Sequence, residues 1–191
     1  MLTPDVFFPL LERFARILDD CGVRYHLTGG LVAVHYAEPR LTQDADLVVD
    51  PVQLQAHLDR FLEAIHQLGC LADAATIREA VSRKRMFQVV DPQEALKIDF
   101  YPRELVPGEL DRSIVIDLTA DLQFPIVSRP DLIASKLVWI SKGSHKSRRD
   151  VKLLMRGANE DDEAVARACV DQLGLTDLLE DVLAEPDEID A

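Results

Sequence analysis

The segment 28–50 constrains the fold of this chain more than any other stretch. It reads TGGLVAVHYAEPRLTQDADLVVD, and it joins a short strand to a helix through Gly29 and Gly30 before a second strand begins. Glycine has no Cβ, so the backbone at this turn allows another group, such as a phosphate, to come close. Asp44 and Asp46 open the second strand and point to the same face, because side chains at i and i+2 of a strand do so. The segment therefore predicts a phosphate-binding turn beside a carboxylate pair suited to a divalent cation.

Composition limits the size, partners and location that we expect. The chain has 191 residues, 48% hydrophobic and 29% charged, which is enough for a packed core in one domain or in one domain with a helical appendage. The formal net charge of −13 excludes a broad nucleic-acid surface, because phosphate neutralisation needs Lys and Arg, but it allows a local basic patch. No secretion signal and no apolar run of about 18 residues is recognisable, so we expect a cytoplasmic protein without a membrane span.

Hydrophobic periodicity and turn residues predict the order of the elements. Helices are expected at 4–20, 31–37, 51–67, 75–82, 130–141, 146–156, 161–173 and 175–184. Strands are expected at 24–27, 45–49, 87–90, 96–100, 113–117 and 122–127. This order predicts an α+β fold, in which a small mixed β-sheet with flanking helices occupies residues 1–128 and a helical C-terminal third, residues 129–191, packs on it.

A third carboxylate, Asp99, lies in the apolar strand sequence LKIDFYP, with Lys97 on the same face. Such a group is costly to bury unless it is paired or bound to a metal. If this strand neighbours the strand of Asp44 and Asp46, three carboxylates converge, and a cation relieves their repulsion. All-oxygen ligation favours Mg²⁺ or Mn²⁺. Two alternatives stay open: a polar helix-to-strand turn around Asp44 and Asp46, and an edge strand with Asp99 facing solvent.

A second polar block lies at 129–155 and reads RPDLIASKLVWISKGSHKSRRDVKLLM. An amphipathic helix over 130–141 leaves Lys136 near the edge of the apolar face, where it either contacts a ligand or extends its ammonium into solvent. A basic cluster follows, formed by Lys142, His145, Lys146, Arg148 and Arg149. The cluster either holds a triphosphate or an RNA backbone, or is a solvated helix start. Asp150 either orients a cation of this cluster or is a surface acid of the helix.

These features together resemble the nucleotidyltransferase superfamily with the DNA polymerase β-like fold. The matching positions are the Gly-Gly turn at Gly29 and Gly30, the D-A-D strand start at Asp44 and Asp46, and the acid Asp99 on a later strand. The resemblance covers roughly residues 23–155 and implies the sheet architecture of that superfamily for the first part of the chain.

The order R-x-T-x-D-x-D, which begins at Arg40 and includes Thr42, looks like the minimal bacterial branch of that superfamily. That branch includes the AbiE-type toxins. The segment P-D-L-I-A-x-K, which ends at Lys136, and the Arg-Asp pair that begins at Arg149 are similar to downstream motifs of those toxins.

The resemblance implies a metal-dependent enzyme that moves an NMP from an NTP to an acceptor hydroxyl. At the matching positions, three acids are implied to hold Mg²⁺ or Mn²⁺ and to carry the catalysis: Asp44, Asp46 and Asp99. Five residues are implied to bind the nucleotide: Gly29, Gly30, Thr42, Lys136 and Arg149. The acceptor stays open between tRNA, a protein and a small molecule such as an aminoglycoside, and an antitoxin protein is the partner if the chain is a toxin. The alternative is an inactive nucleotidyltransferase-fold module for binding or regulation.

Overall fold

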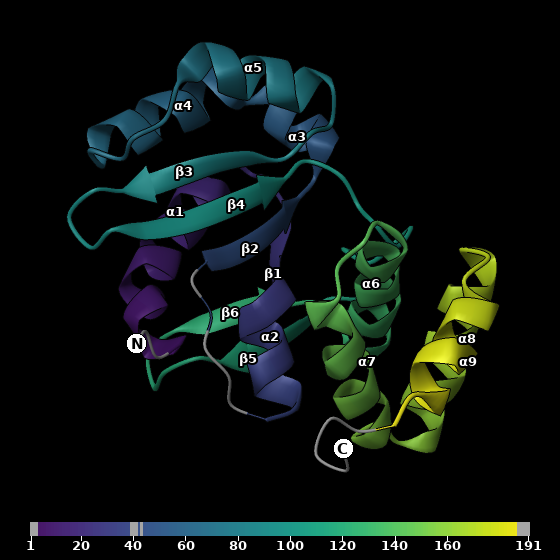
Figure 1. Ribbon diagram of the computed structural model, residues 1–191. Helices are drawn as coiled ribbons and strands as arrows, with labels where there is room; N and C mark the ends of the chain where they lie inside the picture. The colour runs from purple at the N-terminus through teal and green to yellow at the C-terminus, as the bar shows by residue number, and fades with distance from the viewer. Residues whose placement is uncertain (1–3, 39–41, 43, 187–191) are drawn as a thin grey trace. The chain divides into compact units, whose positions relative to one another are not determined.

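The computed structural model describes residues 4–38, 42 and 44–186 (Figure 1). The chain divides into two compact units. The first comprises Met1–Val32 and Arg40–Val127, and the second comprises Ala33–Pro39 and Ser128–Ala191. Helix α2 (Gly29–Tyr36) gives its first half to one unit and its second half to the other, so the two units share one helix.

Over the described residues, the first unit forms a six-stranded mixed sheet with the strand order β3-β4-β2-β1-β6-β5 (Figure 1). The strands are β1 (Tyr25–Thr28), β2 (Asp44–Val49), β3 (Phe87–Asp91), β4 (Leu96–Tyr101), β5 (Ile114–Asp117) and β6 (Gln123–Ile126). Strand β2 pairs in parallel with β4 and antiparallel with β1, which runs parallel to β6. The pairs β3–β4 and β5–β6 are antiparallel. The mixed sheet confirms the predicted α+β class, and each predicted strand is present.

Aromatic packing covers one face of this sheet. The helical elements of the first unit are η1 (Pro4–Phe7), α1 (Phe8–Asp20), α3 (Pro51–Ala56), α4 (Leu58–Gln67) and α5 (Ala74–Ser82). Phe14 of α1 and Phe61 of α4 both pack against Phe100 of β4, with ring centroids 5.4 and 5.5 Å apart. Phe87 of β3 stacks on the same ring at 5.0 Å. Because successive residues of a strand alternate in direction, the neighbours of Phe100 in β4 point to the opposite face.

The predicted single helix over 51–67 is wrong, because the structure has two helices with a break at His57. There the backbone leaves the helical region, with φ −116° and ψ 19°, and α4 begins one residue later. The apolar spacing does not reveal the break. Leu54, Leu58 and Leu62 keep a four-residue interval across it, and all three are buried.

The second unit is helical. Besides the end of α2, it contains α6 (Arg129–Ser141), α7 (Lys146–Arg156), α8 (Glu160–Gln172) and α9 (Thr176–Ala184), which confirms the four predicted C-terminal helices. Ser128 caps α6 by accepting a hydrogen bond from the amide of Asp131, and Asn159 caps α8 through the amide of Asp162. No helix among the described residues is both long enough and apolar enough to cross a membrane.

Candidate functional site

A line of polar residues crosses the sheet from β3 to β1. Gln88 is in register with Asp99, Asp99 with Asp46, and Asp46 with Thr28. Residues paired in this way on neighbouring strands face the same side, so the four side chains of this cross-strand line share the face opposite Phe100. The adjacency of β2 and β4, on which the convergence of the acids depended, is therefore confirmed.

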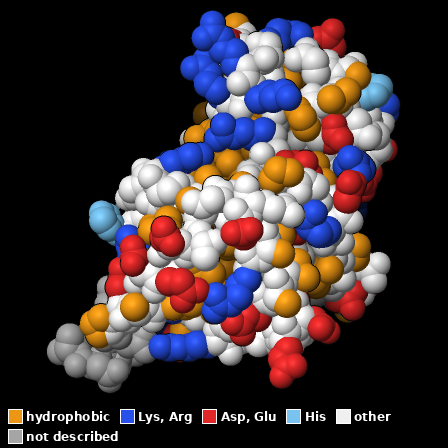
Figure 2. All heavy atoms as spheres, turned by 90° about the vertical axis from the view of Figure 1, so that its right-hand side faces the viewer, with side chains coloured by type: hydrophobic (Ala, Val, Ile, Leu, Met, Phe, Trp, Pro, Cys, Tyr) orange, Lys and Arg blue, Asp and Glu red, His pale blue; other side chains and the backbone are white. Residues whose placement is uncertain are grey.

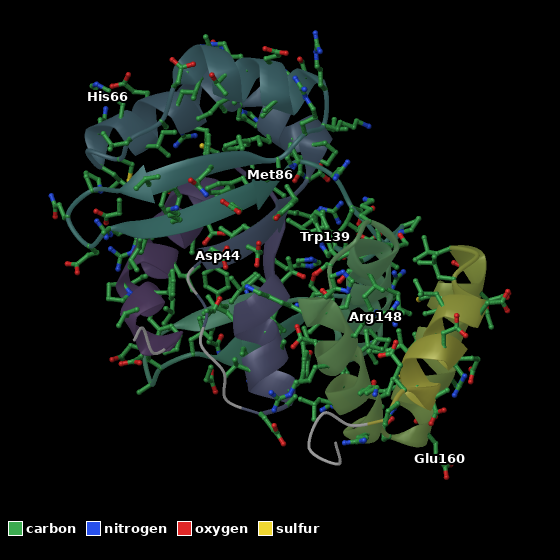
Figure 3. All side chains as sticks on the ribbon, in the orientation of Figure 1. Asp44, His66, Met86, Trp139, Arg148 and Glu160 are labelled. Carbon is green, nitrogen blue, oxygen red and sulfur yellow. The ribbon has the colours of Figure 1, made fainter. Side chains whose placement is uncertain are left out.

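Asp44, labelled in Figure 3, begins β2. It lies on the same face as Asp46, because residues at i and i+2 of a strand do so. In the parallel pairing with β4, Asp44 is in register with the exposed Lys97. Thr42 is buried, and its hydroxyl donates to the backbone carbonyl of Asp44 at 3.1 Å and to its Oδ1 at 3.4 Å. The contacts of Thr42 thus fix the start of β2. Arg40, part of the same motif, lies outside the described residues.

Gly29 lies directly against Asp46. Its φ is +71°, a conformation that L side chains rarely adopt, and a Cβ at this position would be 1.9 Å from Asp46 Oδ2. The sequence predicted that this glycine makes room for a phosphate. The structure gives a different reason, because the carboxylate of Asp46 occupies the space beside Gly29; the phosphate contact stays a prediction. Gly30, the next residue of α2, is buried.

The two carboxylates in register each accept a hydrogen bond from a neutral donor. Gln88 Nε2 donates to Asp99 Oδ1 at 2.7 Å, and Tyr101 Oη donates to Asp46 Oδ1 at 3.3 Å. Burial raises the pKa of Asp99 above its usual value; the hydrogen bond from Gln88 opposes this shift and the charge of Asp44 adds to it. Burial and then the charge of Asp46 raise the pKa of Tyr101, so its phenol stays protonated and able to donate.

The chemistry of this face fits a hard divalent cation. Asp44, Asp46 and Asp99 present carboxylate oxygens, the ligands that Mg²⁺ and Mn²⁺ prefer. In the part of the chain that the structure describes, no three His, Cys, Asp or Glu side chains are grouped closely enough to hold one ion. Ionised carboxylates repel one another, and Asp46 and Asp99 are instead held by Tyr101 and Gln88. The donor types therefore match the predicted metal, while a three-carboxylate ligand group is not formed among the described side chains.

Lys136 lies in the second unit. The sequence predicted it near the edge of an apolar face, but in the structure it is buried. Its ammonium is 2.8 Å from Asp150 Oδ2, and the two side chains are only 8% and 6% exposed. The ammonium of Lys136 on α6 can be buried because Asp150 on α7 supplies the opposite charge. Asp150 is therefore neither a surface acid nor, through this contact, a partner of the basic cluster.

The basic cluster has local partners within the second unit. Arg149 is exposed and lies 3.0 Å from Glu38, Arg148 pairs with Glu185, and the Lys142 ammonium is 5.2 Å from the centre of the Trp139 ring. Trp139 and Arg148 are labelled in Figure 3. These contacts agree with the interpretation of a solvated helix start, since exposed ion pairs exchange easily for other partners.

Sequence reasoning missed Gln88 and Tyr101. Two weak signals were present: Gln88 is the polar residue of the otherwise apolar strand FQVV, and Tyr101 follows Asp99 at i+2 and so shares its face. Neither signal identifies the acceptor of the hydrogen bond. The strand register identifies it: Gln88 is directly opposite Asp99, and Tyr101 is two residues after Asp99, which is opposite Asp46.

The comparison with protein families identifies the class of the molecule. The family model described as Nucleotidyl transferase AbiEii toxin, Type IV TA system, matches residues 11–187. The chain belongs to the AbiEii family. The match includes the cross-strand line and the buried pair of Lys136 and Asp150, and it confirms the resemblance drawn from the motifs. No curated protein matches the chain.

Solved structures similar to this AbiEii-family chain share its fold. The solution structure of the antibiotic-resistance factor ANT(2'')-Ia has a TM-score of 0.56 at 11% identity, covering 91% of this chain and 96% of that one. The crystal structure of ANT(2")-Ia in complex with adenylyl-2"-tobramycin has a TM-score of 0.54 at 12% identity, covering 86% and 97%. An antigenic nucleotidyltransferase-like protein from Paracoccidioides brasiliensis has a TM-score of 0.54 at 14% identity, covering 94% of each chain. At these identities the likeness establishes a nucleotidyltransferase fold alone.

Proposed function

We propose that this AbiEii-family chain transfers an NMP from an NTP to an acceptor hydroxyl in a reaction that needs Mg²⁺ or Mn²⁺, and that it acts as the toxin of a toxin–antitoxin pair. The observation that carries the proposal is the register of Asp46 with Asp99, with Asp44 on the same face and Gly29 against Asp46. Membership of the AbiEii family supports the reaction class and the toxin role.

In the proposed reaction, the acceptor oxygen bonds to the α-phosphorus while the bond from that phosphorus to the bridging oxygen breaks and pyrophosphate leaves. The acceptor proton passes to Asp99, which is in register with Asp46. Asp44, Asp46 and Asp99 would hold the cation, which when bound would supply positive charge at the triphosphate. The protein contributes mainly position and charge, as is usual in reactions at phosphorus.

We predict that Gly29, Gly30, Thr42, Lys136 and Arg149 contact the nucleotide. The backbone amides that open α2 suit phosphate oxygens. Arg149 can exchange its exposed pairing with Glu38 for a phosphate at little cost. An ammonium has three donors, so the pairing of Lys136 with Asp150 is compatible with a further contact to phosphate.

We propose that the acceptor is tRNA, a protein or a small molecule. A net charge of −13 disfavours extended contact with an RNA backbone, so an RNA acceptor would be held locally. The complex of ANT(2")-Ia with adenylyl-2"-tobramycin makes an aminoglycoside worth testing as the small molecule. The family description also leads us to propose an antitoxin protein as a partner.

A thermal-shift experiment tests the proposal. Wild-type protein and the Asp44→Ala/Asp46→Ala variant are heated with each NTP in the presence of Mg²⁺. The matched control is Asp117→Ala/Asp121→Ala, which removes two exposed acids. We expect at least one NTP at about 100 times its Kd to raise the Tm of wild type and control by roughly 5–10 °C, with no rise in the Asp44/Asp46 variant.

Transfer of label from an α-³²P NTP to tRNA, protein or aminoglycoside then identifies the acceptor. An equal Tm rise in wild type and in the Asp44→Ala/Asp46→Ala variant would show that these carboxylates do not hold the nucleotide and its metal. Absence of a rise with every NTP would favour the inactive binding module.

A further inference from the structure

We propose that Gln88 and Tyr101 are positioning residues that restrain the carboxylates of Asp99 and Asp46, two of the acids proposed to hold the cation. The inference rests on the proposed metal-dependent function. It adds to the site two residues that were not predicted from the sequence. Both donors come from the same sheet as their acceptors, β3 for Gln88 and β4 for Tyr101. The strand pairing itself therefore sets where each donor lies.

Both carboxylate oxygens of Asp46 have restricted positions. Tyr101 Oη donates to Oδ1 at 3.3 Å, and Oδ2 lies where a Cβ of Gly29 would be. Rotation of the carboxylate towards Gly29 is thus blocked by backbone, and rotation the other way breaks a hydrogen bond. A carboxylate held from two sides loses less entropy when it binds a cation than one that turns freely.

Asp99 is held by a shorter hydrogen bond. Gln88 Nε2 donates to Oδ1 at 2.7 Å, and the two residues are directly in register across β3 and β4. Asp99 is buried, so the cost of burying its charge is reduced by this donor. The hydrogen bond uses one oxygen, and a carboxylate has a second oxygen for ligation.

The chemical type of both donors supports a positioning role. An amide and a phenol orient a carboxylate without adding a positive charge, whereas Lys or Arg at these positions would neutralise the acid and compete with a cation. Loss of a hydrogen-bonding partner that orients a metal ligand typically costs about 10- to 100-fold in metal affinity or activity in known sites. Gln88 and Tyr101 therefore have the position and the chemical type that a positioning role requires.

The test is a direct Mn²⁺ titration of the full chain, followed by the electron paramagnetic resonance signal of free Mn²⁺, in Tyr101→Phe and Gln88→Leu. Two matched controls make the same chemical changes elsewhere in the sheet. Tyr25→Phe changes a tyrosine of β1 that packs on Phe124. Gln123→Leu removes another cross-strand Gln–Asp hydrogen bond, in which Gln123 Nε2 donates to Asp117 Oδ1 at 3.0 Å.

We expect roughly 10-fold weaker Mn²⁺ binding in Tyr101→Phe and in Gln88→Leu, and unchanged binding in both controls. The Tm without metal, measured in all five proteins, separates positioning from general destabilisation, because a merely structural role moves the Tm and not the affinity. Mn²⁺ binding in Tyr101→Phe and Gln88→Leu as tight as in wild type, or tighter, overturns this inference and leaves the proposed function intact. Absence of Mn²⁺ binding by wild type overturns both.

Discussion

At the scale of single residues, Gly29 carries two constraints at once. Its backbone has a φ of +71°, and its missing Cβ leaves room for Asp46 Oδ2. Gly22 has a similar φ of +66°, but nothing lies within 4 Å of a Cβ placed there. Substitution of the two glycines therefore separates the cost of the backbone conformation from the cost of displacing Asp46.

We predict that Gly22→Ala lowers the free energy of unfolding by about 1–2 kcal/mol, the cost of a left-handed conformation. Gly29→Ala should cost more, because the methyl group must also displace the Asp46 carboxylate, and it should abolish the NTP-dependent Tm rise. Urea unfolding of the two variants measures the difference. Equal losses of stability with nucleotide binding retained in both would contradict the close contact of Gly29 with Asp46.

At the scale of elements, the buried pair of Lys136 and Asp150 joins α6 to α7. A charge that loses its partner at a buried position is expensive, whereas an apolar pair of similar volume is often tolerated. We predict that Lys136→Met and Asp150→Leu each lower the free energy of unfolding by about 3–5 kcal/mol, and that the double variant recovers most of this loss.

The control for that pair is Arg149→Met, which removes the exposed contact with Glu38 and should cost only about 0–1 kcal/mol. Urea unfolding followed by the fluorescence of Trp139, on the same helix as Lys136, measures all four variants. A loss below about 1 kcal/mol in both single variants would mean that the buried pair does not stabilise the second unit.

Surface charge at the element scale is arranged in pairs. Arg167 of α8 lies 2.9 Å from Glu163 in the same helix and 2.6 Å from Glu180 of α9. In the lower half of the face drawn in Figure 2, acidic and basic side chains are interspersed. That part of the surface therefore offers no broad basic area, whereas Lys and Arg side chains gather in the upper part of the same view.

At the scale of the whole molecule, the shared helix α2 predicts how the chain unfolds. Its first half belongs to the sheet unit and its second half to the helical unit. Within the second unit, the Arg129 guanidinium lies 4.8 Å from the centre of the Tyr36 ring at the end of α2. Loss of either unit therefore removes packing from one half of the same helix.

We predict a single cooperative transition, in which the fluorescence of Trp139, the chain's one tryptophan, and far-ultraviolet circular dichroism change at the same urea concentration. Trp139 reports on the helical unit, and circular dichroism reports on both. Adding Mg²⁺ and NTP should move both curves together, since ligand bound to the native state stabilises all that unfolds with it. Two separated midpoints would show that the units unfold independently.

The sequence by itself determined the order of the elements, the α+β class and the family. These depend on local patterns: apolar spacing, glycine turns, caps, and the motifs around Asp44, Asp46 and Asp99. The same local information did not reveal the break at His57, because Leu54, Leu58 and Leu62 keep helical spacing across it.

Only the tertiary structure decided which groups meet. Strand register placed Asp99 opposite Asp46 and brought in Gln88, while the fold of the helical unit gave Lys136 its buried partner Asp150. Asp46 and Asp99 come from strands that are distant in the chain, whereas the other two pairs come from consecutive strands or helices. Their pairing is selected by the burial of whole faces and by charge compensation in the assembled core, which no local spacing encodes.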